Sequence, residues 1–309
     1  MNKLGFSLDI EDWYHIPPIS GEPESIYKNS KEFLSQWRSS YDYITIPTME
    51  ILDILDQYEI ITTIFIVNNI LENYPELIQE IKKRKHEIGC HGLYHESKLN
   101  PITKRAIFNK SEFINRTILS KKQLEHHFNT SVVGYRAPNS YISGWMIDAL
   151  EEMGFEYDSS VSVNSLYNKT DSRLDGVSTT PYFPEIGQLN IGKFRRNIVE
   201  IPFSFYNILG CRIPTNGGPM LRFFGPQIIK NGIIQSLKKG PTSFYFHSID
   251  VCSKSFPYLS FSNRLFWLIK GEKVKKYIIN IIKYMKKMNV DMVPLRNIAR
   301  DLLKEDGCS

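Results

Sequence analysis

The stretch "FSLDIEDWYH", residues 6 to 15, begins as an apolar strand and ends in three carboxylates, Asp9, Glu11 and Asp12. Hydrophobic residues would be expected here if the strand simply continued into a core. In proteins with parallel sheets, functional side chains gather where the strands end. The stretch therefore predicts a buried strand that delivers acidic groups to a site.

Strand and helix patterns alternate along the rest of the chain. Strand-like runs at 61–67, 86–91, 132–138, 155–160, 198–204, 243–250 and 290–295, of which 61–67 is continuous and β-branched, are separated by helical spacing at 46–58, 74–85, 101–127, 143–154 and 275–288. This alternation predicts βαβ units and a parallel sheet. Because no G-x-G-x-x-G or G-x-x-x-x-G-K-[ST] motif occurs, a (β/α) barrel, complete or incomplete, is favoured over nucleotide-binding folds.

The domain prediction is one barrel domain over residues 1–309. Residues 164–197 are rich in Pro, Gly, Asn and basic residues, which indicates an irregular excursion from the barrel. Residues 261–309 are expected to supply a C-terminal helix and a closing strand.

Composition narrows the class of protein. The chain is 42% hydrophobic and 23% charged, with a net charge of +5 carried mainly by lysines on helical patterns. Solvated helix faces explain these lysines better than nucleic-acid binding does, and peripheral contact with a membrane surface stays open. The sequence does not predict the oligomeric state.

Cysteine spacing and the N-terminus bear on the compartment. Cys90, Cys211, Cys252 and Cys308 form no Cys-x-x-Cys pair, which favours a reducing compartment over a zinc ribbon or a disulfide scaffold. The first residues reach carboxylates too soon for a signal peptide, and no apolar run is long enough to be a transmembrane segment. We therefore expect a protein of the cytoplasm or of the inner membrane face.

Other polar residues end the later strands. These are His91 and His95 in "CHGLYH", Arg136 in "GYRAP", Asp158 in "YDSS" and His247 after "FYF". Each has an ordinary structural explanation: a solvent-exposed or structural histidine pair, an interior ion pair for the arginine, a turn cap for the aspartate, and a core histidine. Their coincidence at successive strand ends favours a shared site instead.

The chemistry of these groups indicates metal-assisted hydrolysis. Two imidazoles and one carboxylate form a ligand set for Zn²⁺ or a similar divalent ion, and a carboxylate outside that set would act as a base toward bound water. Residues 9 and 11 share a face of a strand, so one would be the base and the other a ligand. Asp12 is an alternative ligand, and the spacing leaves this choice open.

The motifs resemble a known family. In order, "FSLDIEDWYH", "HEIGCHGLYH", "GYRAPNS", "YDSS" and "FYFHSID" are similar to the five motifs of the polysaccharide deacetylases, which share the NodB homology domain. The first motif is most similar to the Asp-x-Glu-Asp-Trp branch found in exopolysaccharide and cell-surface glycan loci. The resemblance implies a distorted (β/α) barrel and removal of acetyl groups from N-acetylated sugars with one divalent metal ion.

The resemblance also implies a role for each residue. Asp9 is the expected base, with Arg136 orienting it, and His247 is the expected general acid; Asp158 occupies the place of the fourth motif's aspartate. The metal would be held by His91 and His95 together with Glu11 or Asp12. The expected oxyanion and substrate contacts are Pro138, Asn139, Trp13 and Tyr14.

The predicted function is therefore a metal-dependent N-deacetylase acting on an N-acetylated glycan or glycan precursor. Zinc is the favoured ion, and cobalt, nickel and iron are alternatives. An amidase for a small C–N substrate and a non-catalytic glycan-binding barrel are the alternative functions. The specific sugar and its linkage are not encoded in these motifs.

Overall fold

The computed structural model describes residues 2–21, 25–37, 42–95, 109–163, 170, 172, 174 and 177–304. The strands are β1 (Lys3–Ile10), β2 (Thr63–Ile66), β3 (Glu87–Cys90), β4 (Gly134–Tyr135), β5 (Tyr157–Asp158), β6 (Val199–Glu200), β7 (Phe205–Ile208), β8 (Cys211–Pro214), β9 (Thr242–His247) and β10 (Asp291–Val293). The helices are α1 (Ser30–Gln36), α2 (Thr45–Gln57), α3 (Asn69–Asn73), α4 (Pro75–Lys83), α5 (Lys110–Phe128), α6 (Gly144–Glu152), α7 (Pro219–Leu237), α8 (Phe261–Leu265), α9 (Glu272–Lys287) and α10 (Leu295–Lys304).

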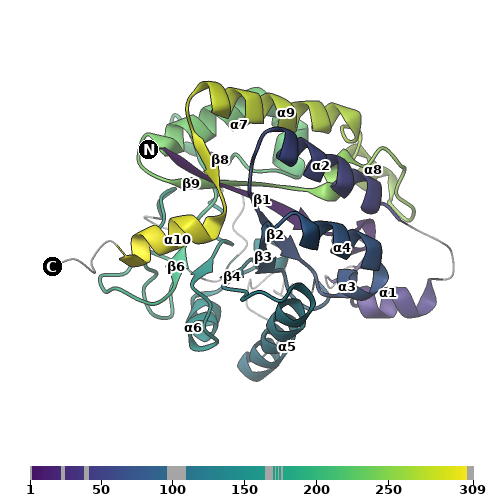
Figure 1. Cartoon of the computed structure of the whole chain (residues 1–309), viewed down its shortest axis with the longest axis horizontal. Helices are drawn as coiled ribbons and strands as arrows, with labels where there is room; N and C mark the ends of the chain where they lie inside the picture. Colours follow the sequence, from purple (N-terminus) through teal and green to yellow (C-terminus); the bar gives the residue numbers. More distant parts are fainter. Residues whose placement is uncertain are drawn as a thin grey trace.

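The main sheet is parallel and strongly curved, as the alternating pattern predicts. Its strand order is β10-β1-β2-β3-β4-β5-β6, and β9 pairs with the other edge of β1. A single parallel bridge between Phe203 and Ser243 links the segment after β6 back to β9. The sheet thus curls into the distorted barrel expected from the sequence, with helices around it (Figure 1).

Two apolar layers hold this barrel together. The outer core lies between strands and helices and includes Leu4, Phe6, Leu8 and Ile10, every second residue of β1. The inner core includes Phe65 and Tyr157, and it continues into Leu295, Ile298 and Ala299 of α10. Because α10 packs against this inner core, it covers one end of the barrel, and the site lies toward the other end.

Glycines make room for the large rings inside the barrel. A Cβ atom at Gly89 would lie 2.4 Å from the Phe65 ring, and one at Gly134 would lie 2.1 Å from Tyr157. Both distances are far below van der Waals contact, so these strands pass closely beside the rings only because the side chains are absent.

Several elements differ from the sequence prediction. Helices α1 and α10 and the antiparallel β7–β8 hairpin were not predicted. Of the predicted strand at 155–160, only Tyr157 and Asp158 form β5; the following Ser159 and Ser160 accept from Arg136 and donate to Asp158, respectively. The first part of the predicted helix at 101–127 and part of the excursion at 164–197 lie outside the described residues; the described part of that excursion carries two antiparallel bridges, Tyr182–Glu200 and Pro184–Ile191.

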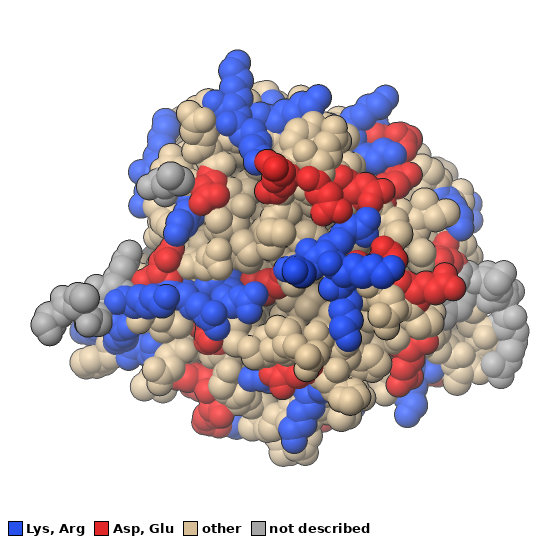
Figure 2. All heavy atoms as spheres, viewed as in Figure 1, with Lys and Arg blue, Asp and Glu red and all other residues tan. Residues whose placement is uncertain are grey.

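Charged side chains of both signs share the face shown in Figure 2. Within the described part of the chain, no helix is long and apolar enough to cross a membrane. The cysteines at 90, 211 and 252 are free thiols.

Candidate active site

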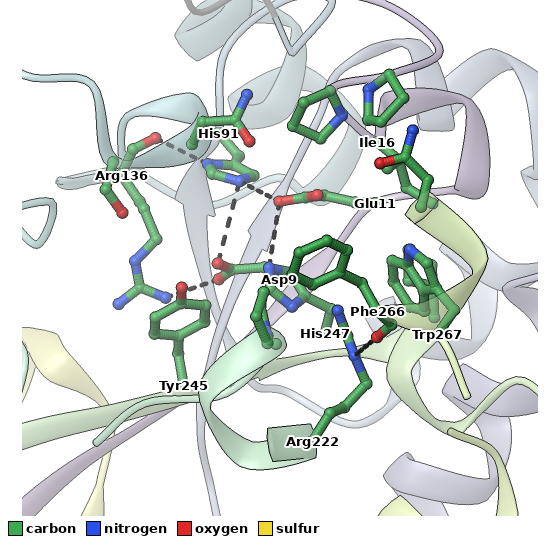
Figure 3. A pocket seen from close by; sticks show the side chains of 18 of the residues that line it. Asp9, Glu11, Ile16, His91, Arg136, Arg222, Tyr245, His247, Phe266 and Trp267 are labelled. Carbon is green, nitrogen blue, oxygen red and sulfur yellow. Dashed lines mark hydrogen bonds and ion pairs between the residues drawn. The ribbon is translucent and has the colours of Figure 1, made fainter. Parts of the chain in front are cut away.

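The carboxyl ends of the parallel strands surround one cavity of about 240 Å³. Asp9 and Glu11 reach it from β1, His91 from the end of β3, Arg136 from the end of β4 and His247 from β9 (Figure 3). Asp9 and His247 are paired in register across β1 and β9, so both side chains lie on the inner face of the barrel at one level. Asn139 lines it too, so the structure brings six of the predicted site residues to one cavity.

Glu11, His91 and His95 form a compact group at this cavity. The Glu11 Oε1 atom lies 2.8 Å from His91 Nε2 and 3.1 Å from His95 Nε2. The ligand atoms of all three residues lie within 4.8 Å of one another, a separation that one metal ion can bridge. Burial opposes ionisation of Glu11, but the charges of His95 and His247 hold its pKa well below the usual range.

The local geometry of the two histidines fits metal binding. His91 Nδ1 lies 2.8 Å from the backbone oxygen of Arg136, and its Nε2 lies 2.8 Å from Glu11 Oε1. With Nδ1 donating to the backbone, Nε2 would be free to bind an ion shared with Glu11. The His95 side chain is 1% exposed; its Nε2 faces the Glu11 carboxylate at 3.1 Å, and its Nδ1 has no hydrogen-bond partner in the described part of the chain. Its backbone has φ of 56°, which is strained for a residue with a side chain. Two buried imidazoles directed at one carboxylate are a donor set that fits a divalent metal.

Asp9 is held by a buried arginine rather than by this group. Arg136 Nη1 donates to Asp9 Oδ1 at 2.7 Å, and both side chains are 2% exposed. The other Asp9 oxygen lies 4.0 Å from His91 Nε2. Asp9 therefore lies in an ion pair with Arg136, beside the group formed by Glu11, His91 and His95.

Arg136 is itself fixed by the strands around it. Its guanidinium lies 4.2 Å from the centroid of the Phe65 ring and 4.8 Å from that of Tyr245. Its Nε donates to the Ser159 backbone oxygen at 2.9 Å, and Nη2 to the Ser159 hydroxyl at 3.0 Å. Ring contacts and directional hydrogen bonds together leave this side chain one orientation.

The structure places Asp158 beneath the site rather than in the cavity. It is fully buried and shares a hydrogen bond with the carboxyl group of Glu200. Burial raises the pKa of both groups, and that of Glu200 lies well above the usual range because the charge of Asp158 adds to the effect. Asp158 also accepts from the Ser160 hydroxyl at 2.7 Å, and Ser160 in turn accepts from the Ala137 N–H. Its position supports the loop that carries Arg136.

His247 has a partner that sequence analysis missed. Its Nδ1 lies 3.1 Å from Asp250 Oδ2, and Arg222 forms an ion pair with the other oxygen of Asp250. Burial alone would lower the pKa of His247, but the charge of Glu11 and the hydrogen bond to Asp250 raise it to about 9. The His-x-x-Asp spacing in "HSID" was the available signal, because residues three apart in a turn lie side by side.

Asp12 turns away from the group of Glu11, His91 and His95. It caps the turn Trp13–His15, where its Oδ1 accepts from the Trp13 N–H at 2.7 Å and its other oxygen accepts from the Tyr74 hydroxyl. Burial raises its pKa to about 7. Of the two alternatives left by the sequence, the structure places Glu11, not Asp12, beside His91 and His95.

Trp13 and Tyr14 also lie inside the protein. Both are 0% exposed; Trp13 packs edge-on against Phe33, and Tyr14 stacks on the same ring. A sugar would reach them only after a rearrangement of the core. The aromatic side chains that line the cavity are instead Tyr245, Phe266 and Trp267, which were not singled out in the sequence (Figure 3).

The loop after Arg136 lies at the cavity wall. Asn139 lines the cavity and has φ of 53°, while Pro138 is buried behind it. A non-glycine residue in this conformation is uncommon and is frequently found at functional sites.

Comparison with known proteins finds sequences that are similar to this chain. A family model described as polysaccharide deacetylase matches residues 40–157, and one described as a domain of unknown function (DUF3473) matches residues 165–293. A peptidoglycan-N-acetylglucosamine deacetylase of Bacillus cereus is 26% identical over 109 residues, which are 35% of this chain and 47% of that protein. The comparisons support the polysaccharide deacetylase family. The chain thus aligns with less than half of the length of this curated deacetylase.

Two solved structures share the fold. A Mycobacterium smegmatis protein assigned to the polysaccharide deacetylases superposes with a TM-score of 0.60 at 18% identity, covering 99% of this chain and 92% of the other. The allantoinase Puue gives 0.57 at 16% identity, covering 96% and 89%. At these identities the likeness is one of fold.

The deacetylase match covers only part of the candidate site. It includes His91, His95 and Arg136, whereas Asp9 and Glu11 precede it and His247 falls in the second matched region. The grouping of these residues therefore rests on the geometry of the barrel.

Proposed function

We propose that the protein is a metal-dependent hydrolase that removes the N-acetyl group from an N-acetylated sugar of a surface polysaccharide or of a glycan precursor. The observation that supports this most is the register of Asp9 opposite His247, with Glu11, His91 and His95 at the same cavity. Amide hydrolysis needs a base and an acid on two sides of the scissile bond, and this arrangement supplies both.

Glu11, His91 and His95 are the proposed metal ligands. A divalent ion bound there would polarise the amide carbonyl and lower the pKa of an attacking water. Zinc is the favoured ion, because imidazole and carboxylate ligands suit it; cobalt, nickel and iron remain alternatives.

Asp9 is the proposed base. Its carboxylate would accept the proton of the attacking water, and the ion pair with Arg136 holds it directed into the cavity. The loop at Pro138 and Asn139 would present a backbone N–H to the oxygen that becomes negative during attack.

His247 is the proposed acid. A protonated imidazole would donate to the leaving amine as the C–N bond breaks, and the contact with Asp250 keeps the proton on the ring near neutral pH. Arg222 compensates the charge of Asp250 and so holds that carboxylate in place.

The relatives agree with this reaction class. The curated relative acts on N-acetylglucosamine units of peptidoglycan, as its name states. Membership of the exopolysaccharide branch, and a cytoplasmic or inner-membrane location, remain predictions from the sequence.

The test is acetate release from N-acetylglucosamine oligomers by the purified, metal-loaded chain. Wild type should release acetate, Asp9→Asn and His91→Ala should lose at least about a hundredfold in rate, and Asp12→Asn, a carboxylate outside the group, should keep most of it. Ammonia release from small amides without acetate release would favour the amidase instead. Sugar binding with neither product would favour the non-catalytic barrel.

A further inference from the structure

One rim of the cavity carries an unusual number of exposed apolar side chains. Phe261, Leu265 and Leu268 in and after α8 follow one another at helical spacing, and Phe261 is 81% exposed and Leu268 74%. Their shared face is turned to solvent rather than to the core.

This face continues to the mouth of the cavity. Phe266 lines the cavity and is half exposed, and its ring packs edge-on against Phe223 of α7 at 5.6 Å. Phe224 beside it is also exposed. We call this surface the α8 patch; its members are Phe223, Phe224, Phe261, Leu265, Phe266 and Leu268.

Negative charge is missing from the chain that builds the patch. Between residues 201 and 271 the sequence contains a single acid, Asp250, which is buried and paired with Arg222. The same segment contains eight cations: Arg212, Arg222, Lys230, Lys238, Lys239, Lys254, Arg264 and Lys270. The next acid along the chain, Glu272, pairs with Lys275.

Three of these cations lie in or beside α8. Arg264 is exposed within the helix, whereas Lys254 precedes the helix and Lys270 follows it in the chain. Lys254 lies toward α2, where its Nζ donates to the Asp42 backbone oxygen and Glu50 and Glu272 line the same pocket. Lys270 is tied to the Lys254 segment because its Nζ donates to the Cys252 backbone oxygen at 3.0 Å.

Exposed apolar side chains together with cations indicate what kind of partner the α8 patch would bind. Clustered exposed Phe and Leu side chains mark interaction sites on soluble proteins, and aromatic or Leu side chains surrounded by cations are typical of segments that enter the interface of an anionic bilayer. A soluble polyanionic glycan would use the cations but would leave Phe261, Leu265 and Leu268 in water. We propose that the α8 patch docks the protein on an anionic lipid surface, with the mouth of the cavity beside the membrane.

This inference does not depend on the chemistry proposed for the cavity, because docking is measured without turnover. The full chain is sedimented with vesicles of phosphatidylcholine alone and with vesicles of equal parts phosphatidylglycerol and phosphatidylcholine. The test variant is F261S/L265S/L268S, which changes no residue that lines the cavity. The matched control is L119S/I186S/F194S, which removes three exposed apolar side chains from α5 and from the segment between β5 and β6.

We expect wild type and the control to bind the anionic vesicles, and the test variant to bind at least about tenfold more weakly. K254Q/R264Q should weaken binding to anionic vesicles, and added salt should do the same. If F261S/L265S/L268S does not fold, F261S alone and K254Q/R264Q decide the question. The proposal would be overturned if wild type did not bind the anionic vesicles, or if the test variant bound them as well as wild type. It would also be overturned if soluble polyglucuronate competed away all vesicle binding.

Discussion

The imidazole of His247 lies 3.1 Å from a carboxylate oxygen of Asp250, three residues later in the same turn. A cation held by Glu11 would offset the effect of the Glu11 charge on His247, so Asp250 becomes the main group that keeps the imidazole protonated.

Asp250→Asn should therefore lower the pKa of His247 and reduce activity about tenfold to a hundredfold at pH 8. The sign follows from the role of an acid: when its pKa falls, the protonated fraction at a given pH falls too. The alkaline limb of the kcat profile should move to lower pH. An unchanged limb would contradict the role assigned to Asp250, whatever the loss in kcat.

The placement of Glu11 and Asp12 predicts different metal contents for two similar variants. Glu11→Gln should lower bound metal at least about tenfold after dialysis, because it removes the carboxylate between His91 and His95. Asp12→Asn should retain the metal, since Asp12 bonds only to the turn and to Tyr74. Elemental analysis per chain checks both, and the opposite pattern would make Asp12 the ligand.

Arg136→Lys should reduce kcat/KM about a hundredfold although it keeps the charge. A single ammonium cannot reach Asp9 and both Ser159 atoms at once, so the base would lose its orientation. Ser7→Ala is a suitable control, because it removes only one neutral contact of the same guanidinium. Rates of the two variants that agree within about twofold would contradict this explanation.

His86 should make stability depend on pH far from the active site. Burial lowers its pKa from 6.5 to about 4, and its Nδ1 accepts from the Thr62 N–H. Between these values the unfolded chain binds a proton that the folded chain excludes, so stability falls as pH falls from 6.5 toward 4, by up to about 3 kcal/mol. His86→Asn keeps an acceptor without the titration. Urea unfolding at pH 7 and pH 4.5 should show a smaller difference for this variant than for wild type.

The Asp158–Glu200 pair should act in the opposite direction. The raised pKa of Glu200 means that the folded chain keeps a proton that the unfolded chain releases above the ordinary glutamate range, so this pair loses stability as pH rises. Glu200→Gln should be close to wild type in stability at low pH and should flatten the decline at alkaline pH. If the free energy of unfolding changed equally between pH 5 and pH 9 in the two proteins, the carboxyl groups of Asp158 and Glu200 would not share a proton.

The sequence predicts the scaffold well where hydrophobic periodicity is strong. The runs at 6–10, 61–67 and 86–91 become β1, β2 and β3, and the helical spacing at 46–58 and 275–288 becomes α2 and α9. The bounds of short strands such as β4, β5 and β6 are harder to predict from the sequence, because two residues cannot show a hydrophobic period. Helix α1 was missed because tertiary packing around Phe33, rather than a long apolar repeat, stabilises it.

Residue types predict the site less completely than the fold. Strand ends correctly indicate which backbones approach the cavity, but the direction of a side chain just past a strand depends on the turn. The Asp12 side chain accepts a hydrogen bond from the backbone N–H of the next residue and so caps the turn, and Trp13 packs into the core. Phe266 and Trp267 come from an irregular segment with no periodic signal, so only the three-dimensional structure shows that they line the cavity.

The pairing of β1 has a consequence for how the protein is made. This first strand bonds to β2 early in the chain, but its other partners are β9 and β10, which leave the ribosome late. Contacts so distant in sequence are slow to form, because a long loop must close first. Asp9 and His247, the proposed base and acid, would therefore come together only near the end of synthesis, so a nascent, partly built barrel would lack the proposed site.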